Sequence, residues 1–120
     1  MEAKAISKNV RQSARKIRQV ADLVRGKDLE LALNTLHFCN KKASEVVEKT
    51  IRSCVANLLN TDAGGHLEPE ELYLKNILVN EGPTARRFRP RAMGRATIIR
   101  KRSSHVSVEI AEIKDKNKNN

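Results

Sequence analysis

The residues best suited to chemistry in this sequence are arginines gathered between Gly82 and Val108. That interval holds seven arginines and one lysine and contains no acidic residue. A guanidinium carries a planar fork of donors that matches phosphate and base edges better than the point charge of lysine. Unpaired cations are too costly to bury, so a compact fold would leave this stretch facing water or a polyanion.

The strand and turn signals in this stretch predict a long projecting β-hairpin over about residues 80–105. Ile77–Val79 before it and the alternating Val106–Ile110 segment after it are typical of strands. Pro90–Gly94 predicts the turn between the two arms. Each arm spans about a dozen residues, or roughly 40 Å, against a radius of gyration of about 13–14 Å for a domain of this length. A disordered basic loop is the alternative interpretation.

Length and charge predict one domain over residues 1–113, with a disordered polar tail at 114–120. The net charge of +10 and the pI of about 10.1 indicate a nucleic-acid partner. The charge is uneven along the chain: +6 over residues 1–27, −4 over 28–81 and +8 over 82–102. The middle block therefore predicts a packing unit, and the two basic segments predict the binding face.

The remaining patterns predict an α+β fold in which three helices pack on a small antiparallel sheet. An edge strand is expected over 2–11, a loop over 60–69, and a strand over Leu72–Val79 with a bulge near Lys75 and Asn76. The expected helix caps are Ser13, with the helix ending at Gly26, then Asp28 and Asn40. The expected inner faces of the helices are Ile17, Val20, Ala21 and Val24; Leu29, Ala32, Leu33 and Leu36; and Ala43, Val46, Val47, Ile51, Cys54, Val55 and Leu58.

Two sets of helical charges have different interpretations. Arg15, Lys16 and Arg18 lie in the first turns of the first helix, where the helix dipole disfavours cations, so phosphate contacts are expected for them. Arg25 at the other end suits the dipole. On the third helix, Glu45 and Glu48 are expected to point outward beside Lys41, Lys42, Lys49 and Arg52, and this mixture indicates a solvated face.

The sequence offers no arrangement for catalysis and none for a metal or cofactor. The three histidines are scattered, and there is no phosphate-binding glycine loop or nucleophile elbow. Ser104 and His105 are neighbours on a predicted strand and would point to opposite faces. Cys39 and Cys54 lack ligand spacing, and Cys54 is expected to be a buried free thiol, which fits a reducing compartment. No span of membrane length and no signal peptide is visible, so a cytoplasmic or organellar location away from membranes is expected.

Two motifs in order, Ser13–Gly26 and Glu81–His105, with Asn40–Ala43 between them, give the chain a family resemblance over about residues 2–112. It resembles the bacterial form of protein twenty-two of the large ribosomal subunit. The resemblance implies a protein that is not an enzyme, binds large-subunit rRNA, bridges rRNA domains during assembly and touches neighbouring ribosomal proteins. It also implies that the hairpin tip lines the polypeptide exit tunnel and meets the nascent polypeptide.

Charge and resemblance together define the expected site residues. The expected rRNA-binding residues are Lys4, Lys8, Arg11, Ser13, Arg15, Lys16, Arg18, Arg25, Arg86, Arg87, Phe88, Arg89, Arg91, Arg95, Arg100, Lys101, Arg102 and His105. The resemblance implies that the tunnel wall is formed by Arg91, Ala92, Met93, Gly94 and Arg95, and that changes at residues 85–87 alter macrolide sensitivity. Family members often carry Lys where Met93 stands, which leaves this tip less charged.

Three alternatives stay open at this point. Phe88 can stack on an unpaired base or make a small apolar contact across the hairpin. An architectural DNA-binding protein could use the hairpin as a minor-groove arm, although such proteins usually need a dimer and no apolar stripe is left over for one. A membrane-active cationic protein is the third class.

Overall fold

Strand β5 (Ser104–Glu112) forms the centre of a three-stranded antiparallel sheet with the order β1-β5-β2. The computed structural model describes residues 2–61, 68–90, 94 and 96–113. The edge strands are β1 (Glu2–Val10) and β2 (Leu72–Glu81), so the expected edge strand near the N-terminus is confirmed. Along β5, every second side chain from Val106 to Ile110 is fully buried, because those residues face the helices.

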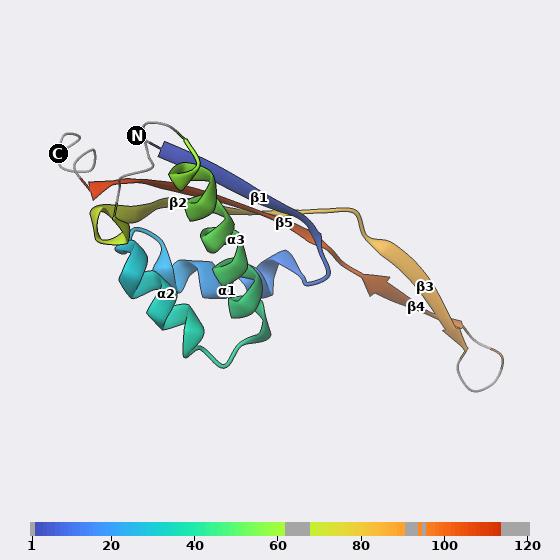
Figure 1. Ribbon diagram of the computed structural model, residues 1–120. Coiled ribbons are helices and arrows are strands. Elements are labelled where there is room, and N and C mark those ends of the chain that lie inside the picture. The colour runs from blue at the N-terminus through green and yellow to red at the C-terminus, as the bar shows by residue number, and fades with distance from the viewer. Residues whose placement is uncertain (1, 62–67, 91–93, 95, 114–120) are drawn as a thin grey trace.

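Three helices cover one face of this sheet: α1 (Ala14–Val24), α2 (Leu29–His37) and α3 (Lys42–Leu59) (Figure 1). The predicted α+β class is thereby confirmed. All of the expected inner-face residues are buried except Leu33, Val46 and Val55, which are partly buried and pack against the core. A single 3₁₀ turn, η1 (Pro69–Glu71), precedes β2.

The N-caps of two helices are the residues predicted from the sequence, and the N-cap of the third is not. Ser13 and Asp28 occupy the N-cap positions of α1 and α2, although neither side chain makes a capping hydrogen bond. Gly26 closes α1 with a φ of 80°, a conformation that suits glycine. The prediction that Asn40 caps α3 is wrong, because Lys41 is the N-cap. Ser44 determines this, since its N–H and its hydroxyl both donate to the carbonyl oxygen of Lys41, at 3.1 and 2.6 Å.

Two irregularities shape the sheet. The pairing of β2 with β5 shifts between Leu74 and Asn76, which confirms the bulge expected there. The pairing of β1 with β5 shifts between Ser7 and Val10. Within this second irregularity Asn9 has a φ of 57°, the sole positive φ of a residue other than glycine in the described part of the chain.

The basic stretch forms a separate two-stranded ladder, β3 (Ala85–Pro90) with β4 (Ala96–Lys101). Figure 1 shows this ladder continuing away from the end of the three-stranded sheet, in a molecule that measures 64 × 26 × 24 Å. None of the residues of either strand is buried, and all described residues of the hydrophobic core lie in the body. Of the predicted turn, Arg91, Ala92 and Met93 lie outside the described residues, as do Arg95, most of the 60–69 loop and the 114–120 tail.

Candidate nucleic-acid interface

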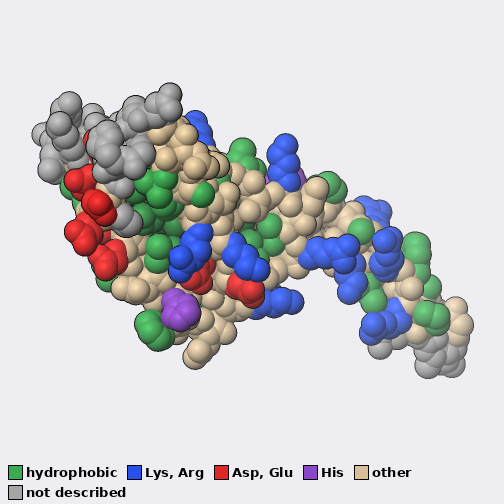
Figure 2. All heavy atoms as spheres, in the orientation of Figure 1, with side chains coloured by type: hydrophobic (Ala, Val, Ile, Leu, Met, Phe, Trp, Pro, Cys, Tyr) green, Lys and Arg blue, Asp and Glu red, His purple; other side chains and the backbone are tan. Residues whose placement is uncertain are grey.

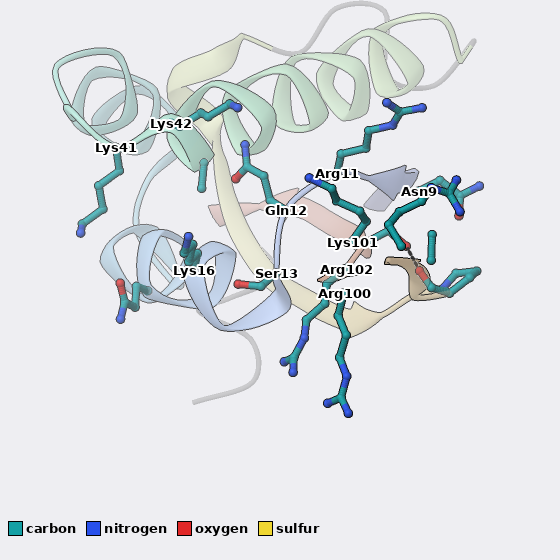
Figure 3. Close-up of a pocket in the computed structure, with 16 residues that line it drawn as sticks. Asn9, Arg11, Gln12, Ser13, Lys16, Lys41, Lys42, Arg100, Lys101 and Arg102 are labelled. Carbon is teal, nitrogen blue, oxygen red and sulfur yellow. Dashed lines mark hydrogen bonds between the residues drawn. The ribbon is translucent and has the colours of Figure 1, made fainter. Parts of the chain in front are cut away.

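A hollow of about 1050 Å³ lies where the hairpin leaves the body (Figure 3). We call it the root groove. Eight of the sixteen described residues that line it are Lys or Arg, and none is acidic. It is lined by Asn9, Arg11, Gln12, Ser13, Lys16, Gln19, Lys41, Lys42, Ala43, Pro83, Ala85, Arg87, Arg100, Lys101, Arg102 and Ser103.

Three parts of the body and the base of the hairpin build the root groove. Arg11 comes from the β1–α1 connection, Lys16 from the first turn of α1, and Lys41 and Lys42 from the start of α3. The hairpin supplies the other four basic residues, which are Arg87 on β3, Arg100 and Lys101 at the end of β4, and Arg102 directly after β4. Residues far apart in the sequence therefore meet at one place, and their shared property is positive charge.

A second hollow of about 570 Å³, the arm hollow, also borders the hairpin base. It shares Ser13, Arg100, Arg102 and Ser103 with the root groove. Its own lining adds Ala14, Arg15, Arg18, Glu81, Gly82, Thr84 and Arg86. Arg100 and Arg102 thus serve two hollows, which makes the base of β4 the centre of the basic surface.

Apart from Glu81, which borders the arm hollow, the described residues bring no carboxylate into the lining of this surface. In the described part of the chain, no carboxylate pairs with the basic side chains of either hollow, and apart from Arg18 and Arg87 none of these side chains forms a hydrogen bond. Elsewhere on α3 the situation differs, because Lys49 pairs with Glu45 at 3.1 Å and Arg52 with Glu48 at 3.0 Å. Figure 2 shows Lys and Arg side chains along the hairpin, whereas acidic side chains gather at the opposite end of the body. A concentration of unpaired cations creates a field that attracts polyanions.

Several of the predicted binding residues lie outside the two hollows or have partners within the protein. Lys4 pairs with Glu109 at 2.8 Å, and this carboxylate raises the pKa of the ammonium group. Arg25 pairs with Asp22 and also donates to the carbonyl oxygen of Ile77 at 2.8 Å. Lys8 is exposed on β1 and lines neither hollow.

Three further predicted residues make contacts within the protein. Arg18 borders the arm hollow and donates to the carbonyl oxygen of Val79. Arg87 donates to the carbonyl oxygen of its neighbour Arg86 at 3.2 Å. His105 accepts a hydrogen bond from the backbone of Asn9 and lines neither hollow.

The structure brings the remaining described residues of the predicted set to the hairpin and its base. The root groove holds Arg11, Ser13, Lys16, Arg87, Arg100, Lys101 and Arg102, and the arm hollow adds Arg15, Arg18 and Arg86. Phe88 and Arg89 lie further along β3 and are exposed. Gly94 is exposed with a φ of 72°. The other expected tunnel residues, Arg91, Ala92, Met93 and Arg95, are not among the described residues.

The sequence patterns did not predict that Lys41 and Lys42 line the root groove. The sequence pattern places them on a solvated face together with Lys49 and Arg52, but only the latter two form ion pairs. A signal was present, because Lys41 and Lys42 begin a helix, where the dipole disfavours cations unless an anion is near. Arg15 and Lys16 carry the same signal at the start of α1. The expectation that Glu48 points outward is also wrong, since its side chain is only 16% exposed.

Other kinds of site are not found in the described residues. Those residues contain no group of three His, Cys, Asp or Glu side chains that could hold a metal ion. None of the described helices is long and apolar enough to cross a bilayer. Cys39 and Cys54 are free thiols, and Cys54 is buried as expected.

A family model and individual relatives both match this chain over nearly its whole length. The model of the family described as ribosomal protein L22p/L17e matches residues 5–111. A protein of Leptospira biflexa serovar Patoc, named large ribosomal subunit protein uL22, is 49% identical over 97% of this chain and 98% of its own length. Proteins with the same name from Myxococcus xanthus and Clostridioides difficile are 50% and 48% identical, each over 95% of this chain and 99% and 100% of their lengths.

Proposed function

Because this chain belongs to the ribosomal protein L22p/L17e family, we propose that it is a structural constituent of the large ribosomal subunit and binds large-subunit rRNA at the base of its hairpin. The protein is not an enzyme. One observation carries the binding proposal: the root groove and the arm hollow gather basic side chains that form no ion pair with a carboxylate of the described chain. A folded RNA supplies the missing negative charge in its phosphates.

The arrangement favours recognition of folded RNA by shape and phosphate contacts. The two hollows share Arg100 and Arg102, so RNA segments in the two hollows would share these guanidinium groups. Double-stranded RNA is read mainly by shape, phosphates and 2′-hydroxyls, which guanidinium and ammonium groups can contact. Binding in both hollows would bridge separate parts of the rRNA during assembly.

The position of β3 and β4 beyond the body supports a further part of the proposal. The arm extends away from the core, and every one of its strand residues is at least partly exposed. We infer that the tip, from Arg91 to Arg95, lines the polypeptide exit tunnel and meets the nascent polypeptide. The body would then contact neighbouring ribosomal proteins in the large subunit, in the cytoplasm or in an organelle.

The test is the salt dependence of binding to a folded large-subunit rRNA fragment. A variant with Arg100→Gln and Arg102→Gln should bind more weakly, and its slope of log affinity against log salt should fall by about 0.7–0.9 for each phosphate that the variant no longer neutralises. The control carries Lys49→Gln and Arg52→Gln, which removes the same charge from side chains already paired with Glu45 and Glu48. Equal slopes for the two variants would contradict the proposal.

The same experiment addresses the alternative of a DNA-binding protein. Duplex DNA of matched length serves as competitor, and the size of the free protein is measured in parallel. We expect a monomer that prefers the rRNA fragment. A stable dimer that prefers DNA would support the architectural DNA-binding alternative.

A further inference from the structure

The imidazole of His105 lies at the point where the hairpin leaves the sheet. On β5 it pairs in register with Asn80 of β2, two residues before Gly82. Its Nδ1 accepts a hydrogen bond from the backbone N–H of Asn9 at 3.1 Å. This N–H belongs to the irregular end of β1, where Asn9 has its φ of 57°. The ring thus connects the end of one edge strand to the central strand.

Gly82 closes the other side of the ring. A Cβ at Gly82 would lie 3.2 Å from Cε1 and 3.3 Å from Nε2 of His105, and 2.8 Å from Oγ of Ser103. These separations are shorter than ordinary van der Waals contact, so the backbone of Gly82 sits directly against the ring and the Ser103 hydroxyl. The imidazole therefore lies between Asn9, at the end of β1, and Gly82, the residue that follows β2.

Three more hydrogen bonds surround this contact. The N–H of Gly82 donates to the carbonyl oxygen of Ser103 at 2.9 Å, and the Ser103 hydroxyl donates to the carbonyl oxygen of Pro83 at 2.6 Å. The Ser104 hydroxyl donates to the carbonyl oxygen of Gln12 at 2.7 Å. Both hairpin arms are thereby tied to each other and to the β1–α1 connection at the level of His105.

We propose that His105 is a positioning residue, whose ring between Asn9 and Gly82 fixes the direction in which the hairpin leaves the body. A fixed direction matters because β3 and β4 form one wall of the root groove and the body forms the other, so the angle between them determines its width. An arm held in place before binding loses less entropy on binding than a swinging one. This role differs from the RNA contact expected for His105, and it concerns the free protein.

The test measures the arm in the free protein by pulsed electron–electron spin resonance. Spin labels are attached to Ser53→Cys on α3 and Thr97→Cys on β4, both at exposed positions, in a Cys39→Ser background that leaves only the buried Cys54. His105→Ala should broaden the distance distribution. His105→Asn, which places an amide oxygen where Nδ1 accepts, should keep the original mean distance. Gly82→Ala should shift the mean, because its methyl group would press on the Ser103 hydroxyl and on the ring and displace both.

The control is His37→Ala, which removes an exposed histidine of α2 that lines neither hollow. It should leave the distribution unchanged. Equal widths for His105→Ala and His37→Ala, together with an unshifted Gly82→Ala, would overturn the proposal. Should His105→Ala fail to fold, the Gly82→Ala and His105→Asn distributions decide the question.

RNA binding separates this inference from the proposed function. His105→Ala should weaken binding of the rRNA fragment without changing the slope against salt, because the number of neutralised phosphates stays the same. A lower slope with an unchanged distance distribution would make His105 an RNA ligand and overturn the positioning role. Failure of the proposed function would appear differently, as weak rRNA binding by the unmodified protein while the distance changes persist.

Discussion

The guanidinium of Arg18 donates two hydrogen bonds to the carbonyl oxygen of Val79, from Nε at 3.1 Å and from Nη2 at 2.8 Å. Seven residues further along, Arg25 donates to the carbonyl oxygen of Ile77 at 2.8 Å. β2 is an edge strand, so one side of its backbone has no strand partner. The two arginines satisfy carbonyl groups of that edge and protect it from pairing with another chain. Both were expected to bind RNA, and both have a structural role in the free protein.

Replacing Arg18 with Ala should therefore reduce stability, whereas replacing Arg15 should not. Removal of a charged hydrogen-bond donor costs about 1.5–3 kcal/mol when the bond is well formed, and the exposed position of Arg18 places its effect at the lower end. Arg15 is exposed and has no partner in the described chain, so Arg15→Ala should change the free energy of unfolding by less than about 0.5 kcal/mol. Urea unfolding of the two variants gives the comparison. Equal effects would show that the Arg18–Val79 contact does not stabilise the fold.

Deleting Arg86–Gly94 should leave the body folded. None of the described residues of this segment belongs to the hydrophobic core, and the strand residues of the arm are exposed or only partly buried. Calorimetry of the deleted protein should show one cooperative transition near that of the full chain. Absence of this transition would mean that the arm contributes to the core.

The two thiols should differ in reactivity. Cys54 is buried, its Sγ donates to the carbonyl oxygen of Ala3 at 3.2 Å, and burial raises its pKa to about 11. The thiolate is the nucleophile, so Cys54 is nearly inert at neutral pH. Cys39 is partly exposed. Brief treatment with iodoacetamide at about pH 8 should give one adduct, at Cys39, by mass spectrometry. The second adduct should appear only in denaturant, and two adducts on the folded protein would contradict the burial of Cys54.

The raised pKa of Cys54 also predicts how stability depends on alkaline pH. The folded state holds the thiol proton more tightly than the unfolded state, whose thiol has the ordinary value of 9.0. The contribution of the protonated thiol to the free energy of unfolding is therefore fully present below pH 9.0 and is lost as the pH rises towards about 11. The pKa of Lys4 is also raised, by its pair with Glu109, so the contribution of this ion pair to stability is also lost at high pH. The free energy of unfolding is measured against pH for the unmodified protein and for Cys54→Ala, and the difference between the two curves isolates the thiol. Curves that stay parallel from pH 9 to 11 would contradict the prediction.

Local patterns were sufficient to predict most of the body. Val and Ile at alternate positions marked β5, helical spacing marked the three inner faces, and the slip in alternation near Lys75 marked the bulge. Each of these signals depends on residues close in sequence. The start of α3 was misplaced by one residue, because residue type favours Asn40 as the cap, whereas the N–H and hydroxyl of Ser44 donate to the carbonyl oxygen of Lys41.

Contacts between distant segments could not be predicted in the same way. Nothing near Arg18 in the sequence indicates that Val79 will present an unpaired carbonyl group, since that depends on β2 becoming an edge strand. Lys41 and Lys42 join the root groove only because α3 begins beside the hairpin base. The contact of His105 with Asn9 requires two strands to pair and one to bulge. Positive charge in the sequence identified candidate binding residues, but the fold determined which of them contact other parts of the protein.

Phe88 provides a prediction that chooses between the two interpretations of this residue. It is 71% exposed and lies opposite Ile98, which is 52% exposed, so the contact across the hairpin leaves most of the ring open to solvent. Arg86, two residues away, shares its face of β3, and an exposed aromatic ring beside a cation is suited to stacking on an unpaired base. Phe88→Leu retains an apolar side chain opposite Ile98 but removes the aromatic face. It should weaken binding of the rRNA fragment by about 5- to 150-fold, which corresponds to the roughly 1–3 kcal/mol of a base–aromatic stack. Ile98→Ala is the matched control and should leave the affinity nearly unchanged. The reverse result, with Ile98→Ala harmful and Phe88→Leu neutral, would assign Phe88 to the cross-hairpin contact alone.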